Sequence, residues 1–236
     1  MTQMSKRGMV RLGIVPQPFR ISLDITDRCN FRCPTCSKWR RPPSPHELGL
    51  EEWKQALERL RGVSLLRDIS IGGGEPLARA DVQQVIRLAK ERGFRTTLIS
   101  NGWLIDDRLL DELERVGLDT LIISLNSLEP TVHDESRGRA GSHERIMRLI
   151  DAWCAKSRKT NLLLSTIVLE ANCGELAGLA RFVRERGLRG ILYQVLLPTE
   201  VHYGFSELPT MPEIAADWHE SSPFWVTSLP ALGRQM

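Results

Sequence analysis

The 236-residue sequence lacks the features that place a protein in a membrane or on nucleic acid. No stretch approaches the roughly 18 apolar residues of a membrane span, and the first twenty residues lack the apolar core of a secretory signal. Neither sign of charge predominates strongly, since the chain has 32 basic and 29 acidic residues. No basic patch with interleaved aromatic residues stands out. We therefore expect a cytoplasmic protein without a membrane partner or a nucleic-acid ligand.

Cysteine is scarce, and its distribution is uneven. Three of the five cysteines, Cys29, Cys33 and Cys36, lie within eight residues. In a reducing compartment such a cluster indicates a metal site rather than a disulfide framework. Cys154 and Cys173 stand alone, and we expect both to be small buried side chains rather than ligands.

The number of clustered cysteines is itself informative. Structural zinc sites are closed by four ligands, and cubane iron–sulfur clusters ordinarily take four cysteines. A site with three cysteines leaves one metal corner open for another molecule. The cluster follows the apolar run Ile21–Thr26, which predicts a strand, so the three thiols are expected on a loop at its carboxyl end.

From residue 20 onward, short β-branched runs alternate with amphipathic stretches, a pattern typical of a parallel α/β sheet. Six such units in fewer than 180 residues fall short of the roughly 250 residues of a complete eight-fold barrel. We expect a partial (β/α)6 TIM-like barrel, with an open doubly wound sheet as the alternative. Strands are predicted at 21–26, 67–71, 95–100, 119–125, 161–169 and 190–197, and helices at 50–61, 82–92, 106–116, 142–156 and 175–186.

The ends of the chain differ from this repeat. Residues 1–19 are expected to form an N-terminal extension and residues 20–198 the core domain. Residues 199–236 contain several prolines and no sustained periodicity, so we expect a short irregular C-terminal tail that covers or extends the barrel, with one short helix at 212–220.

Polar and glycine-rich residues follow successive predicted strands. In parallel α/β folds the carboxyl ends of the strands form the working face, so these residues should line one composite site with the cysteine loop. They are Gly73, Gly74 and Glu75 after the second strand, Asn101 after the third, and Ser124 and Asn126 at the fourth.

Two motifs together carry a family resemblance. Cys29-x3-Cys33-x2-Cys36 after the first strand and Gly73-Gly74-Glu75-Pro76 after the second resemble the radical S-adenosylmethionine (SAM) superfamily over roughly residues 18–198. The stretch Ile25–Cys33 is similar to the branch of the molybdenum-cofactor cyclase and the peptide-modifying maturases. The resemblance implies that the three cysteines ligate a [4Fe–4S] cluster whose fourth iron is chelated by SAM. Reductive cleavage of SAM would then give a 5′-deoxyadenosyl radical.

The resemblance also implies roles for the glycine loop. Gly73 and Gly74 would let the backbone meet the methionine part of SAM, which fits the backbone freedom that glycine provides. Glu75 would support this loop rather than act as an acid or base. Asn101 would lie beside the cofactor and substrate, although a plain capping role is equally open.

Further cofactor contacts are implied on the fourth unit and on the cysteine loop. Ser124 and Asn126 would bind the ribose hydroxyls or carboxylate of SAM, although many relatives carry Asp where Asn126 stands. Arg137 matches an arginine that pairs with the SAM carboxylate, a task that suits a guanidinium. Thr35 stands beside the adenine, where relatives commonly carry an aromatic residue.

The function expected is therefore hydrogen abstraction from a small-molecule or peptide substrate in a biosynthetic pathway, with electrons from a flavodoxin or ferredoxin. The alternative is a non-catalytic protein that binds a cluster or zinc in a regulatory or structural role. Lys38, Arg40 and Arg41 could meet an anionic substrate or redox partner, and the five histidines are expected at the surface. Because no cysteine follows Cys173, we expect no auxiliary-cluster domain, and the chain is either truncated or a reduced single-cluster enzyme.

Overall fold

The computed structural model describes residues 18–40 and 42–195. The tail expected at 199–236, including its helix at 212–220, and nearly all of the expected N-terminal extension lie outside these residues.

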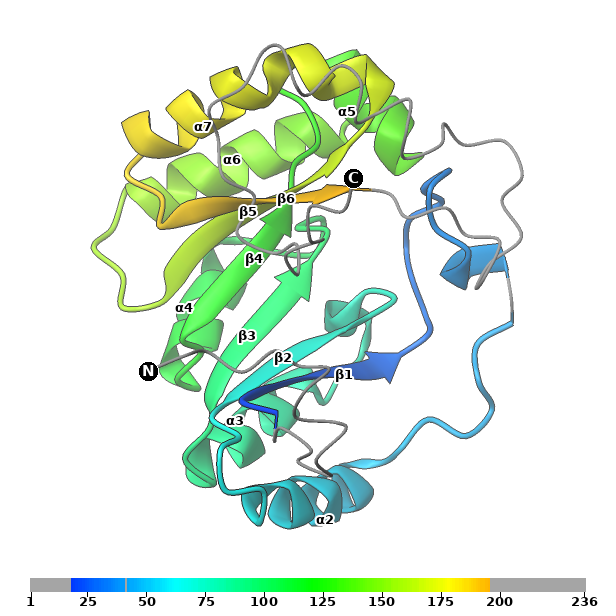
Figure 1. Cartoon of the computed structure of the whole chain (residues 1–236), viewed down its shortest axis with the longest axis vertical. Helices are drawn as coiled ribbons and strands as arrows, with labels where there is room; N and C mark the ends of the chain where they lie inside the picture. Colours follow the sequence, from blue (N-terminus) through cyan, green and yellow to red (C-terminus); the bar gives the residue numbers. More distant parts are fainter. Residues whose placement is uncertain (1–17, 41, 196–236) are drawn as a thin grey trace, which may run out of the picture.

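Six parallel strands form one sheet, and their spatial order is the order of the chain. Within the described residues no pairing joins the last strand to the first, so the sheet is curved but open (Figure 1). This confirms the expected partial (β/α)6 barrel. The strands are β1 (Arg20–Thr26), β2 (Asp68–Gly73), β3 (Arg95–Ser100), β4 (Thr120–Ser124), β5 (Asn161–Val168) and β6 (Gly190–Val195).

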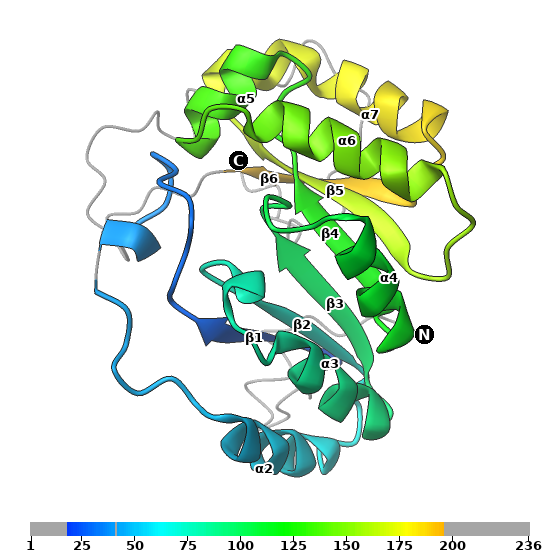
Figure 2. The same cartoon turned by 180° about the vertical axis from the view of Figure 1, so that it is seen from behind.

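Helices cover the outer face of this sheet, and the strand ends all point to one side of the molecule (Figures 1 and 2). The covering helices are α2 (Leu50–Arg61), α3 (Val82–Glu91), α4 (Asp107–Arg115), α6 (Ser142–Cys154) and α7 (Leu176–Glu185). Single 3-10 turns occur at η1 (Lys38–Arg40), η2 (Pro76–Ala78) and η3 (Glu170–Glu175). None of the helices in the described part of the chain has the length and apolarity to cross a membrane.

The core lies between the sheet and its helices. Strand residues that point outward pack against helix residues spaced three or four apart, which is the pattern of an amphipathic helix. Full burial of such aliphatic side chains stabilises the fold by roughly 1.5–3 kcal/mol each. The fully buried members include Ile69, Ile71, Leu98, Leu121, Ile123 and Leu164 on strands and Leu57, Val85, Ile86 and Leu179 on helices.

One further helix corrects the sequence interpretation. The connection 126–141, for which no helix is predicted from the sequence, contains α5 (Pro130–Arg137). Pro130 stands in its first turn, and Gly138 ends it in the left-handed conformation with a φ of 60°. Proline at the start and glycine just past the end are a known helix signature, so the signal was present in the sequence.

Asp81 stands at the N-cap position of α3, but its carboxylate makes no cap bond and instead pairs with Arg79 at 2.7 Å. Two expectations about burial were wrong. Cys154 and Cys173 are exposed rather than buried. His133 is fully buried rather than at the surface.

Candidate functional site

A cavity of about 390 Å³ opens at the carboxyl ends of the strands. It takes residues from all six strands or the loops that follow them. Of the eleven site residues predicted from sequence, all but Glu75 line it. The lining includes Cys29, Cys33, Thr35, Cys36, Gly73, Gly74, Asn101, Ser124, Asn126 and Arg137.

The three clustered cysteines are free thiols held in a tight loop. The N–H of Cys36 donates to the carbonyl of Cys33 at 3.1 Å, and the N–H of Phe31 donates to Sγ of Cys29 at 3.4 Å. Burial raises the pKa of the Cys29 and Cys33 thiols, while Arg137 acts in the opposite direction on both. Thiolates here therefore need positive partners, which the iron of a cluster supplies on binding.

The geometry also bears on the kind of metal site. Among the described residues, no three Cys, His, Asp or Glu side chains converge as ligands of a single metal ion. In an iron–sulfur cluster the cysteine ligands need not converge on one ion, because the cluster contains several irons. The thiols of Cys29, Cys33 and Cys36 instead face one shared cavity.

Gly73 and Gly74 are needed mainly for contact with the cysteine loop. A Cβ on Gly73, whose φ is 123°, would lie 2.4 Å from the carbonyl oxygen of Thr26. A Cβ on Gly74 would lie 2.2 Å from the carbonyl oxygen of Arg28. The backbone N–H groups of Gly74 and Glu75 donate to the same two carbonyls, each at 2.7 Å. The end of β2 therefore holds the chain just before the first cysteine.

Glu75 lies beneath this loop and is fully buried. Its carboxylate accepts from Oγ of Ser100 at 2.8 Å, from the N–H of Asn101 at 2.7 Å and from the N–H of Leu77 at 3.1 Å. Burial raises its pKa, and these three donors oppose that rise. The carboxylate fixes the end of β3 to the loop after β2 instead of facing the cavity.

Asn101 links the end of β3 to the cysteine loop. Its Nδ2 donates to Oδ1 of Asn30 at 2.7 Å, and its Oδ1 accepts from the N–H of Trp103 at 3.0 Å. The side chain is 5% exposed. Asn101 is therefore a structural link as well as part of the cavity wall.

Asn126 is held by a buried polar network. Its Nδ2 donates to Oγ of Ser136 at 2.9 Å, and its Oδ1 accepts from the N–H of Ile167 at 3.0 Å. Its own N–H donates to Nδ1 of His133 at 3.1 Å. Burial, with smaller contributions from Arg137 and His143, lowers the pKa of His133 to about 3. His133 is thus a neutral structural acceptor at physiological pH.

Arg137, at the end of α5, is half-buried and faces the thiols. Its guanidinium lies 5.7 Å over the ring of Phe31, and its buried Nε has no hydrogen-bond partner. A buried donor without a partner costs about 1–3 kcal/mol. An anionic ligand in the cavity would satisfy it. α5 can approach this closely because Gly138 has no side chain. A Cβ at this position would lie 2.2 Å from the carbonyl oxygen of Arg32.

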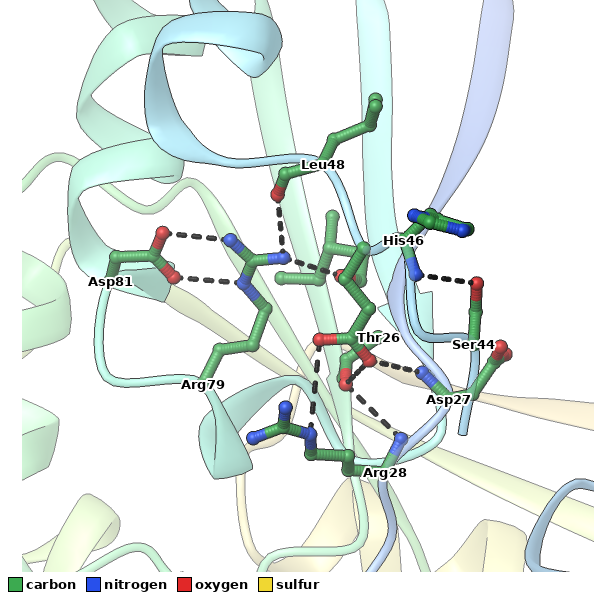
Figure 3. A network of polar contacts seen from close by, with 10 residues as sticks. Thr26, Asp27, Arg28, Ser44, His46, Leu48, Arg79 and Asp81 are labelled. Atoms are coloured by element: carbon green, nitrogen blue, oxygen red, sulfur yellow. Dashed lines mark hydrogen bonds and ion pairs between the residues drawn. The ribbon is translucent and has the colours of Figure 1, made fainter. Parts of the chain in front are cut away.

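A second network fixes the segment that follows the cysteine loop (Figure 3). Arg79 pairs with Asp81 through Nε and Nη2 and donates from Nη1 to the carbonyls of Ile25 at 2.8 Å and Leu48 at 3.0 Å. Glu47 accepts from Oγ1 of Thr26 at 2.6 Å and from the N–H of Asp27 at 3.1 Å. Both ends of the cysteine loop are thereby tied to the end of β1.

Residues 23–183 match the sequence model of a known protein family, described as the radical SAM superfamily. This chain belongs to the radical SAM superfamily. It is 32% identical over 179 residues to a PqqA peptide cyclase of Ruegeria pomeroyi, which covers 74% of this chain and 46% of that protein.

Other radical SAM relatives match to a similar extent. The tungsten-containing aldehyde ferredoxin oxidoreductase cofactor-modifying protein of Pyrococcus furiosus is 29% identical over 181 residues, 75% of this chain and 51% of that protein. Streptococcus suis SuiB bound to S-adenosylmethionine shares the fold with a TM-score of 0.73 at 17% identity, over 89% of this chain and 49% of SuiB. The chain spans about half the length of the curated relatives it matches.

The radical SAM family implies a [4Fe–4S] cluster and SAM, and the residues fit both. Three thiols share one cavity, and a cationic side chain with an unpartnered buried donor faces them. A cluster with three protein thiolates keeps one corner for a non-protein ligand, and the guanidinium suits a carboxylate. The donor set is therefore that of the cofactor pair.

Several residues of this site were not singled out from the sequence. Asn30 and Gly138 act through contacts between distant segments, which no local pattern shows. Gln194 lines the cavity, whereas the hydroxyl of Tyr193, its neighbour on β6, donates to the carbonyl of Leu176. Ser22, Asp24 and Ser165 also line the cavity.

Proposed function

We propose that this protein is a radical SAM enzyme. Cys29, Cys33 and Cys36 would hold a [4Fe–4S] cluster, which would supply the electron for reductive cleavage of SAM to a 5′-deoxyadenosyl radical, and this radical would abstract hydrogen from the substrate. The observation that carries the proposal is the shared cavity of the three thiols and Arg137. A low-potential cluster needs a one-electron donor. It also needs a reducing compartment, which supports the cytoplasm as the location.

In this proposal the residues of the chain bind and orient rather than transfer protons. Arg137 would hold the SAM carboxylate through its guanidinium, and the backbone of Gly73 and Gly74 would meet the methionine part. Ser124 and Asn126 would bind the ribose hydroxyls or the carboxylate, and Thr35 would stand beside the adenine. Glu75 and Asn101 keep the surrounding loops in place.

We propose a peptide substrate in preference to a small molecule. Three curated relatives at 32–35% identity are named PqqA peptide cyclases, and one neighbour in fold is SuiB bound to its precursor peptide SuiA. Within the described residues no pairing joins β1 to β6, so the sheet itself does not close that side against an extended chain. Further polar side chains that line the cavity, Ser22, Asp24, Ser165 and Gln194, offer hydrogen bonds to a peptide.

The test is hydrogen transfer into the nucleoside product. The anaerobically reconstituted protein is incubated with SAM, dithionite and uniformly deuterated candidate peptides. We expect 5′-deoxyadenosine that carries deuterium with the true substrate. Unlabelled 5′-deoxyadenosine with every peptide tested, together with label from a deuterated small metabolite pool, would favour the small-molecule alternative. No 5′-deoxyadenosine from a fully loaded cluster would refute the enzyme itself.

A further inference from the structure

The segment that carries the cysteines has an unusual charge. Residues 28–46 contain five basic side chains and no acidic one, in a chain whose acidic and basic residues are otherwise nearly balanced. Asp27 and Glu47 flank the segment. The basic residues are Arg28, Arg32, Lys38, Arg40 and Arg41.

Two of these side chains gather around one aromatic ring. The guanidinium of Arg32 lies 5.6 Å, and that of Arg40 5.2 Å, from the centre of the Trp39 ring. Arg32 and Arg40 are exposed, and Trp39 is half-buried. We call these three residues the basic rim. Stacked arginine and tryptophan are the residue types most enriched at the centres of protein interfaces.

The basic rim is bonded directly to the cluster-ligand loop. Nε1 of Trp39 donates to the carbonyl of Cys33 at 2.9 Å. Nη1 of Arg32 donates to the carbonyls of Cys29 at 3.1 Å and Phe31 at 3.0 Å. None of the three rim side chains lines the cavity, whereas the cysteine side chains do. The rim therefore lies on the cluster-ligand loop outside the lining of the cavity.

This placement decides what the rim can serve. With SAM and substrate in the cavity, the cavity side of the cluster is closed to a protein. Electron transfer slows steeply with distance, so a protein donor must approach the cluster from the outer side of the loop. The rim is an exposed, positively charged surface on that side, and such a surface attracts an acidic partner.

We propose that Arg32, Trp39 and Arg40 form the docking surface for an acidic one-electron carrier of the flavodoxin or ferredoxin type. The inference rests on the proposed function. The reduced carrier gives up one electron and the oxidised cluster gains it, with no bond made or broken. An acidic segment of a peptide substrate is the competing occupant, and we disfavour it because the rim side chains lie outside the lining of the cavity.

The test measures electron entry without SAM. The reconstituted holoprotein with an oxidised cluster is mixed in a stopped-flow instrument with a chemically reduced flavodoxin, and separately with dithionite. The variants are Arg40→Lys, Arg40→Gln and Arg40→Glu. Arg87→Glu, on the exposed face of α3, is the matched charge-reversal control. Iron content and circular dichroism establish that each variant is loaded and folded.

We expect Arg40→Glu to lower the second-order rate constant with flavodoxin about tenfold at low salt, since steering by charge contributes on this scale. The rate constant of Arg40→Gln should lie between those of Arg40→Glu and the parent protein, and the rate constants of Arg40→Lys and Arg87→Glu should equal that of the parent. Added salt should reduce the differences between variants. The dithionite rates should stay equal throughout. Equal flavodoxin rates in all variants would overturn the proposal, as would equal losses for Arg87→Glu and Arg40→Glu.

The same variants separate the remaining outcomes. If Arg40→Glu leaves flavodoxin reduction unchanged but weakens binding of an acidic substrate peptide, the rim serves the substrate and the proposal is wrong. The protein could also form no 5′-deoxyadenosine while flavodoxin reduces its loaded cluster at a rate that depends on Arg40. That result would support the basic rim as the docking surface and refute the proposed function. The two failures are thereby distinguishable.

Discussion

Asn101 donates a hydrogen bond at 2.7 Å from its Nδ2 to Oδ1 of Asn30, across 71 residues of sequence. This bond joins the end of β3 to the middle of the cysteine loop, directly after Cys29. The loop is thus positioned by the sheet, since Gly74, Glu75 and Asn101 each contact it or its supports.

Asn101→Ala should loosen the cluster without unfolding the protein. Removal of one partner from a buried hydrogen bond costs about 1–3 kcal/mol, and here that cost falls on the loop. We expect a lower midpoint in urea unfolding and faster iron loss to a chelator. Asn161→Ala, at the amino end of β5, removes an exposed 3.2 Å bond to the carbonyl of Asp119 and should retain iron as the parent does. Equal iron loss in both variants would contradict this role.

Gly74→Ala should prevent cluster binding. The added methyl would lie 2.2 Å from the carbonyl oxygen of Arg28, so the start of the cysteine loop must shift. Gly178→Ala on α7 is the matched control, because a Cβ there meets nothing within 4 Å. The control should raise stability by about 0.5–1 kcal/mol, since glycine is unfavourable in a helix. Iron-to-protein ratios after reconstitution check the pair, and full loading of Gly74→Ala would be the contrary result.

Arg137→Gln should weaken SAM binding at an intact cluster. A hydrogen bond to a charged group contributes about 1.5–3 kcal/mol, which corresponds to roughly 10–150-fold in the dissociation constant. Isothermal titration of the holoprotein with SAM measures this. Arg148→Gln, an exposed arginine on α6, should bind as the parent does. A parent-like dissociation constant for Arg137→Gln would remove the carboxylate assignment.

His133 should make stability fall with acid. Its folded pKa of about 3 lies below the unfolded value of 6.5, so the unfolded chain binds the extra proton between these pH values. The contribution of His133 is complete above pH 6.5 and is lost as the pH falls toward 3, at up to about 1.4 kcal/mol per pH unit. His133→Gln should show a shallower decline of unfolding free energy from pH 6.5 to 5. An imidazole that titrates near 6.5 by NMR would refute the buried neutral state.

The strands, most helices and the cavity-lining cysteines could be predicted because each is encoded locally. Apolar runs alternate with helical periods, and polar residues at strand ends converge in any parallel barrel. The role of Glu75 beneath the loop was likewise expected from the family resemblance.

Other features depend on contacts between distant segments. His133 looks like a polar helix residue, yet the helix α5 folds back and buries it against Asn126. The glycines after β2 suggested close approach to a ligand. In the structure, the carbonyl oxygens of Thr26 and Arg28 already leave no room for a side chain at Gly73 and Gly74. Asp81 is of a residue type that favours the N-cap position, yet its carboxylate pairs with Arg79 instead of capping α3. No local pattern contains these partners.

The central claim is that Cys29, Cys33 and Cys36 hold a cluster at which SAM is cleaved. The most direct measurement compares Cys33→Ala with Cys154→Ala after anaerobic reconstitution, with iron content and 5′-deoxyadenosine formed from SAM and dithionite as readouts. Cys154 is exposed and remote in sequence from the loop. The account predicts that Cys154→Ala loads iron and forms 5′-deoxyadenosine as the parent does, while Cys33→Ala does neither. Equal iron loading and equal product in the two variants would contradict it.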